Sequence, residues 1–464
     1  VLLCAAAGLA LAATQPVAMS LPIGGDWIIW FWTYFALPAT FVGCFLISVP
    51  LLALVARVAG PPLSRLLRLP GTLLRQSLLA TPMRQGFTGG TLMVSLAILV
   101  AIWTSSRSVM VGWFETIRMP DAFVYRFPSF TDEQQRAVRG VEAATHVCPT
   151  TTFPVRVVGM QFGIETISPP KTLFVSTDAA SFLRMVDPEW YEGDAQTALR
   201  RLTAGRALLV SREWSVARGV GTGTRLALET VDGPMDFEVV GVISSKGLDL
   251  ATRTFGIRRR FADASVNSIF GTRADAKRYF GVDAANLLLI SLREGVSDEE
   301  AVRQLTEAAP GSVAGTSRDV LRRVRRSLDR MIAVGGALAV GSLILACLGV
   351  GSLIVAEVTA RRFEFGVLRA IGAQRGLLGR LVVGHTLIVA LVGCTAGTML
   401  GVELALVERC FHRRLLGAEY ALHLPADVIA WGAFAVAAAA LIAAVPAIWK
   451  LMHYSPRALF ARRE

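Results

Sequence analysis

The 464-residue sequence has few of the side chains from which catalytic centres are built. It holds five histidines and six cysteines, and it contains no H-E-x-x-H, C-x-x-C or G-x-S-x-G motif. A Walker A loop is also missing, because the glycine-rich run from Gly219 to Thr224 has no Lys followed by Ser or Thr. We interpret this run as a turn between strands. We therefore expect no metal site, no bound cofactor and no enzyme activity on this chain.

Acidic residues are also scarce, and the resulting basic excess is unevenly placed. The chain has 35 Asp and Glu against 47 Lys and Arg, yet residues 115–323 carry 26 of each kind, so the excess of twelve lies beside the apolar runs. This placement follows the positive-inside rule and does not indicate a nucleic-acid partner. Hydrophobic residues make up 53% of the chain and the mean hydropathy is +0.52, which predicts membrane segments together with an aqueous domain.

The apolar runs divide the chain into spans and loops. We expect spanning helices at 27–56, 87–112, 329–356, 381–406 and 428–449, and a truncated segment at 1–13, since a complete span takes roughly 20 residues. A polar turn should follow from Gln15 to Asp26. Because the chain starts at Val1 without a basic n-region, we expect it to begin inside a longer protein, with a signal-peptide core as the alternative.

Charge then predicts the side of the membrane for each loop. The basic segments 57–86, 357–378 and 450–464 should be cytoplasmic, and 57–86 should include an amphipathic stretch broken at Pro70 and Gly71. The segment 113–328 should then be a large extracytoplasmic α+β domain, inserted between two spans of an α-helical transmembrane bundle. Arg409, Arg413 and Arg414 depart from the rule, because they fall in a loop expected on the outer side.

Within the domain, short apolar runs predict strands and amphipathic runs predict helices. We expect strands at 154–160, 207–211, 225–230, 237–243 and 287–292, and helices at 132–142 and 297–309. Cys148 lies in this domain and Cys410 in the last outer loop. Their spacing leaves open whether they pair.

The segment from Glu357 to Gly376 is charged and lies between two apolar runs. Its arginines and glutamates alternate with Phe363, Phe365 and Leu368, a pattern that predicts a short amphipathic helix at the membrane surface. From spacing alone, a basic loop that only fixes topology is an equal alternative.

The residue identities in this segment also resemble a known family signature. Arg361, Glu364, Gly366 and the run from Leu368 to Ala373 closely resemble the R-x-x-E-x-G-x-L-R-A-x-G-A signature of the FtsX/MacB superfamily of ABC transporter permeases. The run from Ser455 to Leu459 resembles the Pro-x-x-Ala-Leu ending of such permeases. The two spans before residue 86 resemble the linker helices of a two-repeat permease. The resemblance implies the C-terminal part of a larger permease in the bacterial inner membrane.

This resemblance also implies partners and a site. ATP and Mg would bind a separate ABC ATPase dimer, and the further partners would be the lipid membrane and a periplasmic adaptor or substrate-binding protein. The residues that would couple to the ATPase are Arg361, Phe363, Glu364, Phe365, Gly366, Leu368, Arg369, Ala370 and Gly372. The implied function is extrusion or membrane extraction of a hydrophobic or lipid-linked substrate. The alternatives are mechanotransmission to an extracytoplasmic partner such as a cell-wall hydrolase, and a membrane-anchored ligand sensor.

The 381–406 span carries further candidates. Gly393, Gly397 and Gly401 recur every four residues on one helix face, which predicts close packing of helices within the chain or between subunits. His385 and Glu403 are ionisable groups in the same span, and the family often has Glu where His385 stands. A proton relay through these two residues is a minor alternative.

Overall fold

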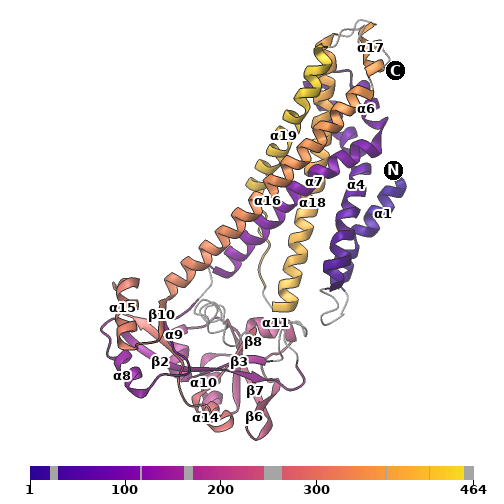
Figure 1. The fold of residues 1–464 in the computed structure, drawn as a ribbon. Helices are drawn as coiled ribbons and strands as arrows, with labels where there is room; N and C mark the ends of the chain where they lie inside the picture. The colour runs from indigo at the N-terminus through magenta and orange to yellow at the C-terminus, as the bar shows by residue number, and fades with distance from the viewer. Residues whose placement is uncertain are drawn as a thin grey trace. The chain divides into compact units, whose positions relative to one another are not determined.

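The computed structural model of the chain describes residues 1–20, 30–114, 118–160, 171–244, 264–360, 362–370, 374–416 and 419–453. They form two compact units. The first consists of Val1–Ser108, Arg330–Glu408 and Leu422–Glu464, and the second of Val109–Asp329 and Arg409–Ala421. Figure 1 shows that the first unit is built from long helices and that the strands belong to the second.

The first unit is a helix bundle. Its elements are α1 (Leu2–Ala12), α2 (Thr14–Ser20), η1 (Trp32–Ala36), α4 (Leu37–Val58), α5 (Gly60–Leu66), α6 (Gly71–Leu79), α7 (Pro82–Val109), α16 (Ser317–Ala360), α17 (Arg362–Ala370), α18 (Arg375–Phe411) and α19 (Ala426–His453), of which α7, α16 and α18 continue into the second unit. Among the described residues, six helical stretches are long and apolar enough to cross a membrane. They are Leu2–Ser20, Trp32–Val58, Pro82–Gly112, Ser317–Ala356, Gly376–Arg414 and Ala426–Trp449. Together with the mixed sheet of the second unit, they confirm the predicted fold class.

One expected turn is wrong, and one expected span is part of a longer helix. The chain does not turn at Gln15, because α2 carries the helix on to Ser20 with Gln15 buried and Pro16 in the first turn, where a missing N–H costs little. The span expected at 329–356 is the second part of α16, which is helical from Ser317. The charged residues that precede the apolar run therefore extend the same helix beyond it.

The basic linker forms two short helices that belong to the bundle core. Pro70 is extended and precedes α6, which agrees with the expected break at Pro70 and Gly71. Leu74 and Leu78 of α6 are fully buried and pack in one cluster with Leu52 of α4 and Ile388 of α18. The apolar face of the linker is therefore covered by protein.

The second unit contains a ten-stranded mixed sheet. Its strands are β1 (Ala122–Tyr125), β2 (Ala144–Arg156), β3 (Lys171–Thr177), β4 (Trp190–Glu192), β5 (Ala207–Ser211), β6 (Arg225–Thr230), β7 (Gly233–Ile243), β8 (Ala264–Thr272), β9 (Leu287–Leu292) and β10 (Val313–Thr316). The order is β10-β1-β9-β2-β3-β8-β5-β7-β4, with β6 paired to β7. The helices are α8 (Asp132–Arg139), α9 (Ala179–Val186), α10 (Ala195–Ala204), α11 (Arg212–Arg218), α14 (Arg273–Phe280) and α15 (Asp298–Ala308), with η2 (Met110–Phe114) and η3 (His412–Leu416).

The sheet order divides this unit into two lobes. In the first lobe the units β1-α8-β2 and β9-α15-β10 interleave as antiparallel strands in the order β10-β1-β9-β2, the arrangement of a split βαβ fold. The second lobe is inserted between β2 and β9 and holds β3 to β8. Strand β2 joins the lobes, because residues 144–150 pair with β9 and residues 151–156 pair with β3.

Buried polar groups fix the seam between the lobes. The Asn286 side chain accepts from the Thr152 backbone nitrogen at 2.8 Å and donates to the Thr152 carbonyl oxygen at 2.7 Å. Asn286 is buried, so these bonds satisfy polar groups that water cannot reach. The seam is therefore held by directional bonds as well as by the strand that crosses it.

The local expectations within this unit have mixed outcomes. The five predicted strands overlap β2, β5, β6, β7 and β9, whereas β1, β3, β4, β8 and β10 were not predicted. The helices expected at 132–142 and 297–309 are α8 and α15, each with a side-chain cap, from Thr131 and Ser297. The run from Gly219 to Thr224 is a turn, but it joins helix α11 to strand β6 and not two strands.

Candidate coupling site

Helix α17 connects the ends of two spanning helices and presents a mixed face. Phe363, Glu364, Val367 and Ala370 are exposed and follow helical spacing, so they share one side of the helix, whereas Gly366 is buried. The Phe363 side chain is 62% exposed. Aromatic groups are enriched at protein-docking surfaces, so the exposed Phe363 favours such a surface here.

The remaining residues of the predicted site are described less fully. Arg361 and Gly372 lie outside the described residues. Phe365, Leu368 and Arg369 lie in α17, but their side chains are outside the description. The Ser455–Leu459 ending and all of 454–464 are also outside it.

Two arginines that the sequence analysis did not single out fix the helices around α17. Arg84 of α7 donates from Nη2 to the carbonyl oxygen of Leu353 in α16 at 3.0 Å. Arg380 of α18 donates from Nη1 to the carbonyl oxygen of Leu67, just after α5, at 3.4 Å. Both are basic residues near the ends of spans, and sequence alone offered only topology as their role.

An apolar cluster lies where these helices meet. Leu378 and Val382 of α18 and Ala447 of α19 are buried there, and Ile354 and Val355 of α16 pack against them. The helices on both sides of α17 therefore share one packed core. Because packed interfaces shift between discrete arrangements, a displacement of α17 has to be accommodated in this cluster.

The glycine stripe of α18 lies against α7. A Cβ atom added to Gly393 would lie 2.7 Å from the Cβ of Leu92, and one added to Gly401 would lie 2.6 Å from the Cβ of Val100. A Cβ atom added to Gly397 would lie 2.7 Å from the carbonyl oxygen of Met93. The stripe thus packs within the chain, because only glycine permits this approach of two helix backbones.

The other candidates in the spans are not brought together. His385 and Glu403 both lie in α18, and their 18-residue separation corresponds to about 27 Å along a helix. This distance gives no support to a proton relay between them. Cys148 is buried in β2 and Cys410 is exposed, and both are free thiols.

The loop between the last two spans belongs to the second unit and is fixed there by charge. Arg212 of α11 lies 2.8 Å from Glu419, and Arg413 of η3 lies 3.1 Å from the same carboxylate. The Arg212 guanidinium also stacks 4.1 Å from the ring centre of Tyr191. Arg413, which departed from the positive-inside rule, is therefore paired with an acid. The loop and the sheet domain form one body and must lie on the same side of the membrane.

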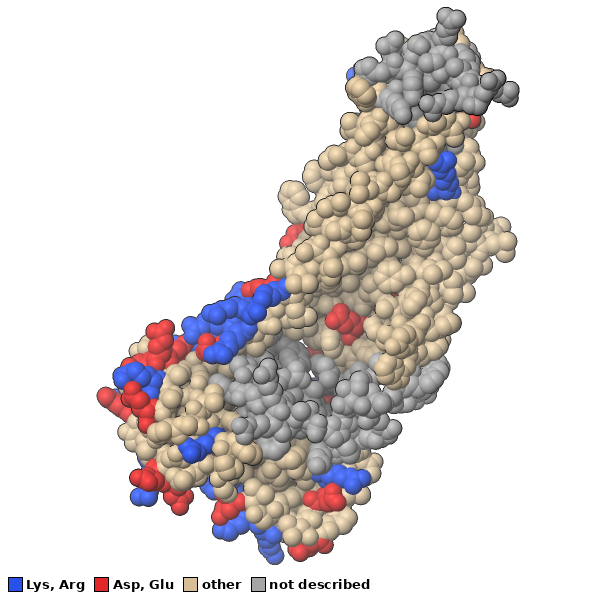
Figure 2. Space-filling model, in the orientation of Figure 1, with Lys and Arg blue, Asp and Glu red and all other residues tan. Residues whose placement is uncertain are grey.

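Charge is distributed unequally between the elements. Figure 2 shows basic side chains gathered over the first turns of α16 and a nearly uncharged surface over the long helices. The exposed arginines of these turns are Arg318, Arg322, Arg323, Arg325 and Arg326. Asp298 of α15 pairs with Arg318 at 3.0 Å and with Arg322 at 2.9 Å. These ion pairs join the start of α16 to the first lobe.

These features define a class: a multi-pass membrane protein in which a large α+β domain is inserted between two spans and a short amphipathic helix joins two others. Residues 336–456 match the family FtsX-like permease C-terminal. These residues therefore carry an FtsX-like permease domain, and the chain as a whole is similar to ABC transporter permeases of the FtsX/MacB type. Its apolar helices and inserted domain fit a multi-pass protein of the bacterial inner membrane.

Two curated relatives support this assignment. An uncharacterised ABC transporter permease protein of Mycobacterium tuberculosis, Rv0987, is 24% identical over 439 residues, which cover 89% of this chain and 48% of that protein. The macrolide export ATP-binding/permease protein MacB of Hyphomonas neptunium is 26% identical over 179 residues, which cover 36% of this chain and 26% of that protein. The chain thus spans about half the length of the first relative and about a quarter of the second.

Among solved structures, the extracellular domain of the noncanonic ABC-type transporter YknZ from Gram-positive bacteria was matched. The match covers 42% of this chain and 98% of the YknZ domain, with 13% sequence identity and a TM-score of 0.28.

Proposed function

We propose that this chain couples ATP hydrolysis on a separate ABC ATPase dimer to the extrusion or membrane extraction of a hydrophobic or lipid-linked substrate. The ATPase binds α17, and ATP and Mg are held by the ATPase and not by this chain. The exposed face of Phe363, Glu364 and Val367 carries this proposal, because it lies on a segment joined at both ends to the bundle. The basic segments next to the spans support a cytoplasmic position for α17 and an extracytoplasmic position for the sheet domain.

The coupling rests on the packing around α17. Closure of an ATPase dimer would move α17 as a unit, since a helix of nine residues keeps its internal hydrogen bonds. The movement would reach α16, α18 and α19 through the cluster of Leu378, Val382 and Ala447. The bond from Arg84 to Leu353 would transmit it to α7.

The nature of the cargo is supported by the surface of α16. From Met331 onward this helix exposes large apolar side chains, which include Val334, Leu338, Leu345 and Leu348. An apolar surface of this extent can contact the hydrocarbon part of a substrate, but it would offer a polar substrate no hydrogen bonds. The relative MacB is named as a macrolide export ATP-binding/permease protein, which agrees with an export function.

The test is co-purification of the ATPase from native membranes in mild detergent. With a Phe363→Ala/Glu364→Lys double variant, the amount of ATPase that co-purifies should fall at least about tenfold relative to the parent chain. A tenfold weaker affinity corresponds to a loss of about 1.4 kcal/mol in binding free energy. The matched control is Phe434→Ala/Glu229→Lys, since both of its parent side chains are also exposed but lie on α19 and β6. Equal ATPase retention by the two variants would refute the coupling site.

The cargo is tested separately in proteoliposomes that contain the chain and its ATPase. ATP-dependent removal of a fluorescent lipid or hydrophobic dye is expected. ATP hydrolysis that is coupled to α17 but removes neither probe would contradict the cargo assignment and favour mechanotransmission.

A further inference from the structure

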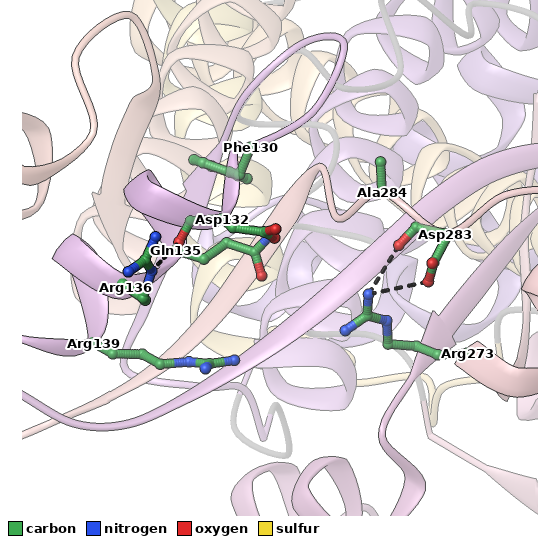
Figure 3. Close-up of a pocket in the computed structure, with 8 residues that line it drawn as sticks. All are labelled: Phe130, Asp132, Gln135, Arg136, Arg139, Arg273, Asp283 and Ala284. Atoms are coloured by element: carbon green, nitrogen blue, oxygen red, sulfur yellow. Dashed lines mark hydrogen bonds and ion pairs between the residues drawn. The ribbon is translucent and has the colours of Figure 1, made fainter.

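A polar groove lies at the seam between the two lobes of the sheet domain. Its volume is about 510 Å³, within the range of ligand-binding clefts, and such clefts are common where two lobes meet. One wall is formed by α8 with Arg136 and Arg139, and the other by Arg273 at the start of α14 together with Asp283 (Figure 3). The site thus combines residues that are more than 130 positions apart in the sequence.

The two arginines of α8 have unused donors. Arg136 donates from Nε to the carbonyl oxygen of Asp132 at 3.3 Å. Within the described part of the chain, its two terminal nitrogens and all three nitrogens of Arg139 have no protein partner. Both side chains are exposed, so these donors face solvent at the groove.

The third arginine is held in place. Arg273 donates from Nη2 to the carbonyl oxygen of Asp283 at 2.8 Å, and its Nη2 lies 3.5 Å from the carboxylate of the same residue. Lys277 donates to that carboxylate at 2.8 Å. The hydrogen bond and charge of Lys277 lower the pKa of Asp283, which therefore stays ionised and is compensated by two cations. The groove lining thus has three arginines against Asp132 and Asp283, and Lys277 beside the lining adds a further positive charge.

The chemistry of the walls restricts the ligand. Guanidinium groups bind carboxylate and phosphate through paired hydrogen bonds, and a groove lined by charges does not suit a hydrophobic molecule. The Asp132 carboxylate and the Gln135 amide oxygen add acceptors beside the arginines. Inorganic phosphate has few donors to offer these acceptors. A peptide would place its carboxylates on the arginines and its backbone N–H groups on these acceptors.

We propose that this groove binds an acidic peptide segment of another protein, with Arg136 and Arg139 as the residues that recognise its carboxylates and Arg273 as a fixed third cation. That the other protein is extracytoplasmic rests on the topology in the proposed function. The binding itself rests on the groove alone.

The experiment uses the full chain in lipid nanodiscs without ATPase. The probe is a fluorescein-labelled capped peptide of alternating Asp and Gly, and binding is followed by fluorescence anisotropy. The peptide in which Asn replaces Asp should not bind. The Arg136→Gln/Arg139→Gln variant should bind the Asp peptide at least about tenfold more weakly, since hydrogen bonds to charged groups are among the strongest.

The matched control removes two arginines of the same unit. Arg184→Gln/Arg200→Gln takes the same charge from α9 and α10, and Arg184 makes the same bond to a carbonyl four residues back as Arg136 does. This control should bind like the parent chain. Equal weakening in both double variants would show attraction to overall charge and would overturn the proposal, and so would displacement of the peptide by an equimolar amount of inorganic phosphate.

A charge exchange gives a second test. Arg136→Glu/Arg139→Glu should lose the Asp peptide and gain a peptide of alternating Lys and Gly. Loss of the first without gain of the second would count against direct recognition. Because no ATPase takes part, failure here leaves the coupling proposal unaffected, and failure of co-purification leaves this site unaffected.

Discussion

Replacing Gly397 of α18 by alanine should destabilise the helix bundle, whereas the same replacement at Gly341 of α16 should not. A Cβ on Gly397 would lie 2.7 Å from the carbonyl oxygen of Met93 and 3.0 Å from the Cβ of Leu96. The first distance is too short for any contact of this kind, and it involves the backbone of α7. The two helices would therefore have to separate along the stripe.

The magnitude follows from two opposing terms. Overpacking a tightly packed core typically costs about 1–3 kcal/mol. Alanine gains up to about 1 kcal/mol over glycine in a helix interior, and this gain applies at both positions. At Gly341 a Cβ would have no atom within 4 Å, so the gain stands alone. The difference between the two variants should therefore be about 1–3 kcal/mol, or roughly 2–10 °C in Tm.

Thermal unfolding of the two purified variants in one detergent, followed by intrinsic fluorescence, measures this difference. Equal Tm values would refute close packing of α18 on α7. A change in oligomeric state on size exclusion without a lower Tm would show instead that the stripe contacts another subunit.

Three further predictions concern the second unit. In a double-mutant cycle on thermal stability, Arg212→Ala and Glu419→Ala should couple by no more than about 1 kcal/mol, because both side chains are partly exposed; a larger value would indicate a stronger anchor for the loop. Asn286→Ala should cost roughly 2 kcal/mol or more in unfolding free energy, because it leaves the buried backbone N–H and C=O of Thr152 unpaired; a neutral result would refute this role. Burial raises the pKa of Asp275 above 3.8, so the folded chain holds this proton more tightly and loses stability as the pH rises from the ordinary carboxyl pKa through the raised one. Asp275→Asn should therefore gain Tm relative to the parent as the pH rises above the ordinary carboxyl pKa, and a difference in Tm that does not change with pH would contradict the assignment.

Much of the membrane architecture could be predicted because hydropathy and charge act locally. A run of apolar residues predicts a span wherever it occurs, and the caps at Thr131 and Ser297 fix helix starts within a few residues. The strongest part of the family resemblance also lay in one continuous segment. These signals require no knowledge of what packs against them.

The missing elements depend on contacts between distant segments. Strand β8 has the polar sequence ASVNSIFGT, and it is stabilised as a strand by pairing with β3 on one side and β5 on the other. The first turns of α16 are rich in arginine, so hydropathy ended the span at residue 329. Arg318 and Arg322 are partnered by Asp298, which lies in another helix. No local pattern predicts such pairs.

In the candidate site, too, local features could be predicted and long-range contacts could not. The segment of α17 and the glycine stripe could be predicted from letters and spacing. The partner of the stripe could not, because α7 lies some 300 residues earlier in the chain. The roles of Arg84 and Arg380 were also hidden, since each donates to a backbone carbonyl, and any residue type presents one.

Continuity of two helices gives the proposed coupling a physical basis. Helix α18 runs without a break from Arg375, close to α17, to Phe411, where η3 follows in the second unit. Helix α16 likewise runs from Ser317, beside the first lobe, to Ala360. A helix resists stretching because every turn is closed by hydrogen bonds, so axial displacement at one end must appear at the other. Under the proposed function, both ends of α16 are held by contacts described above. Asp298 pairs with the arginines of its first turns, and the cluster of Leu378 packs against its last turns.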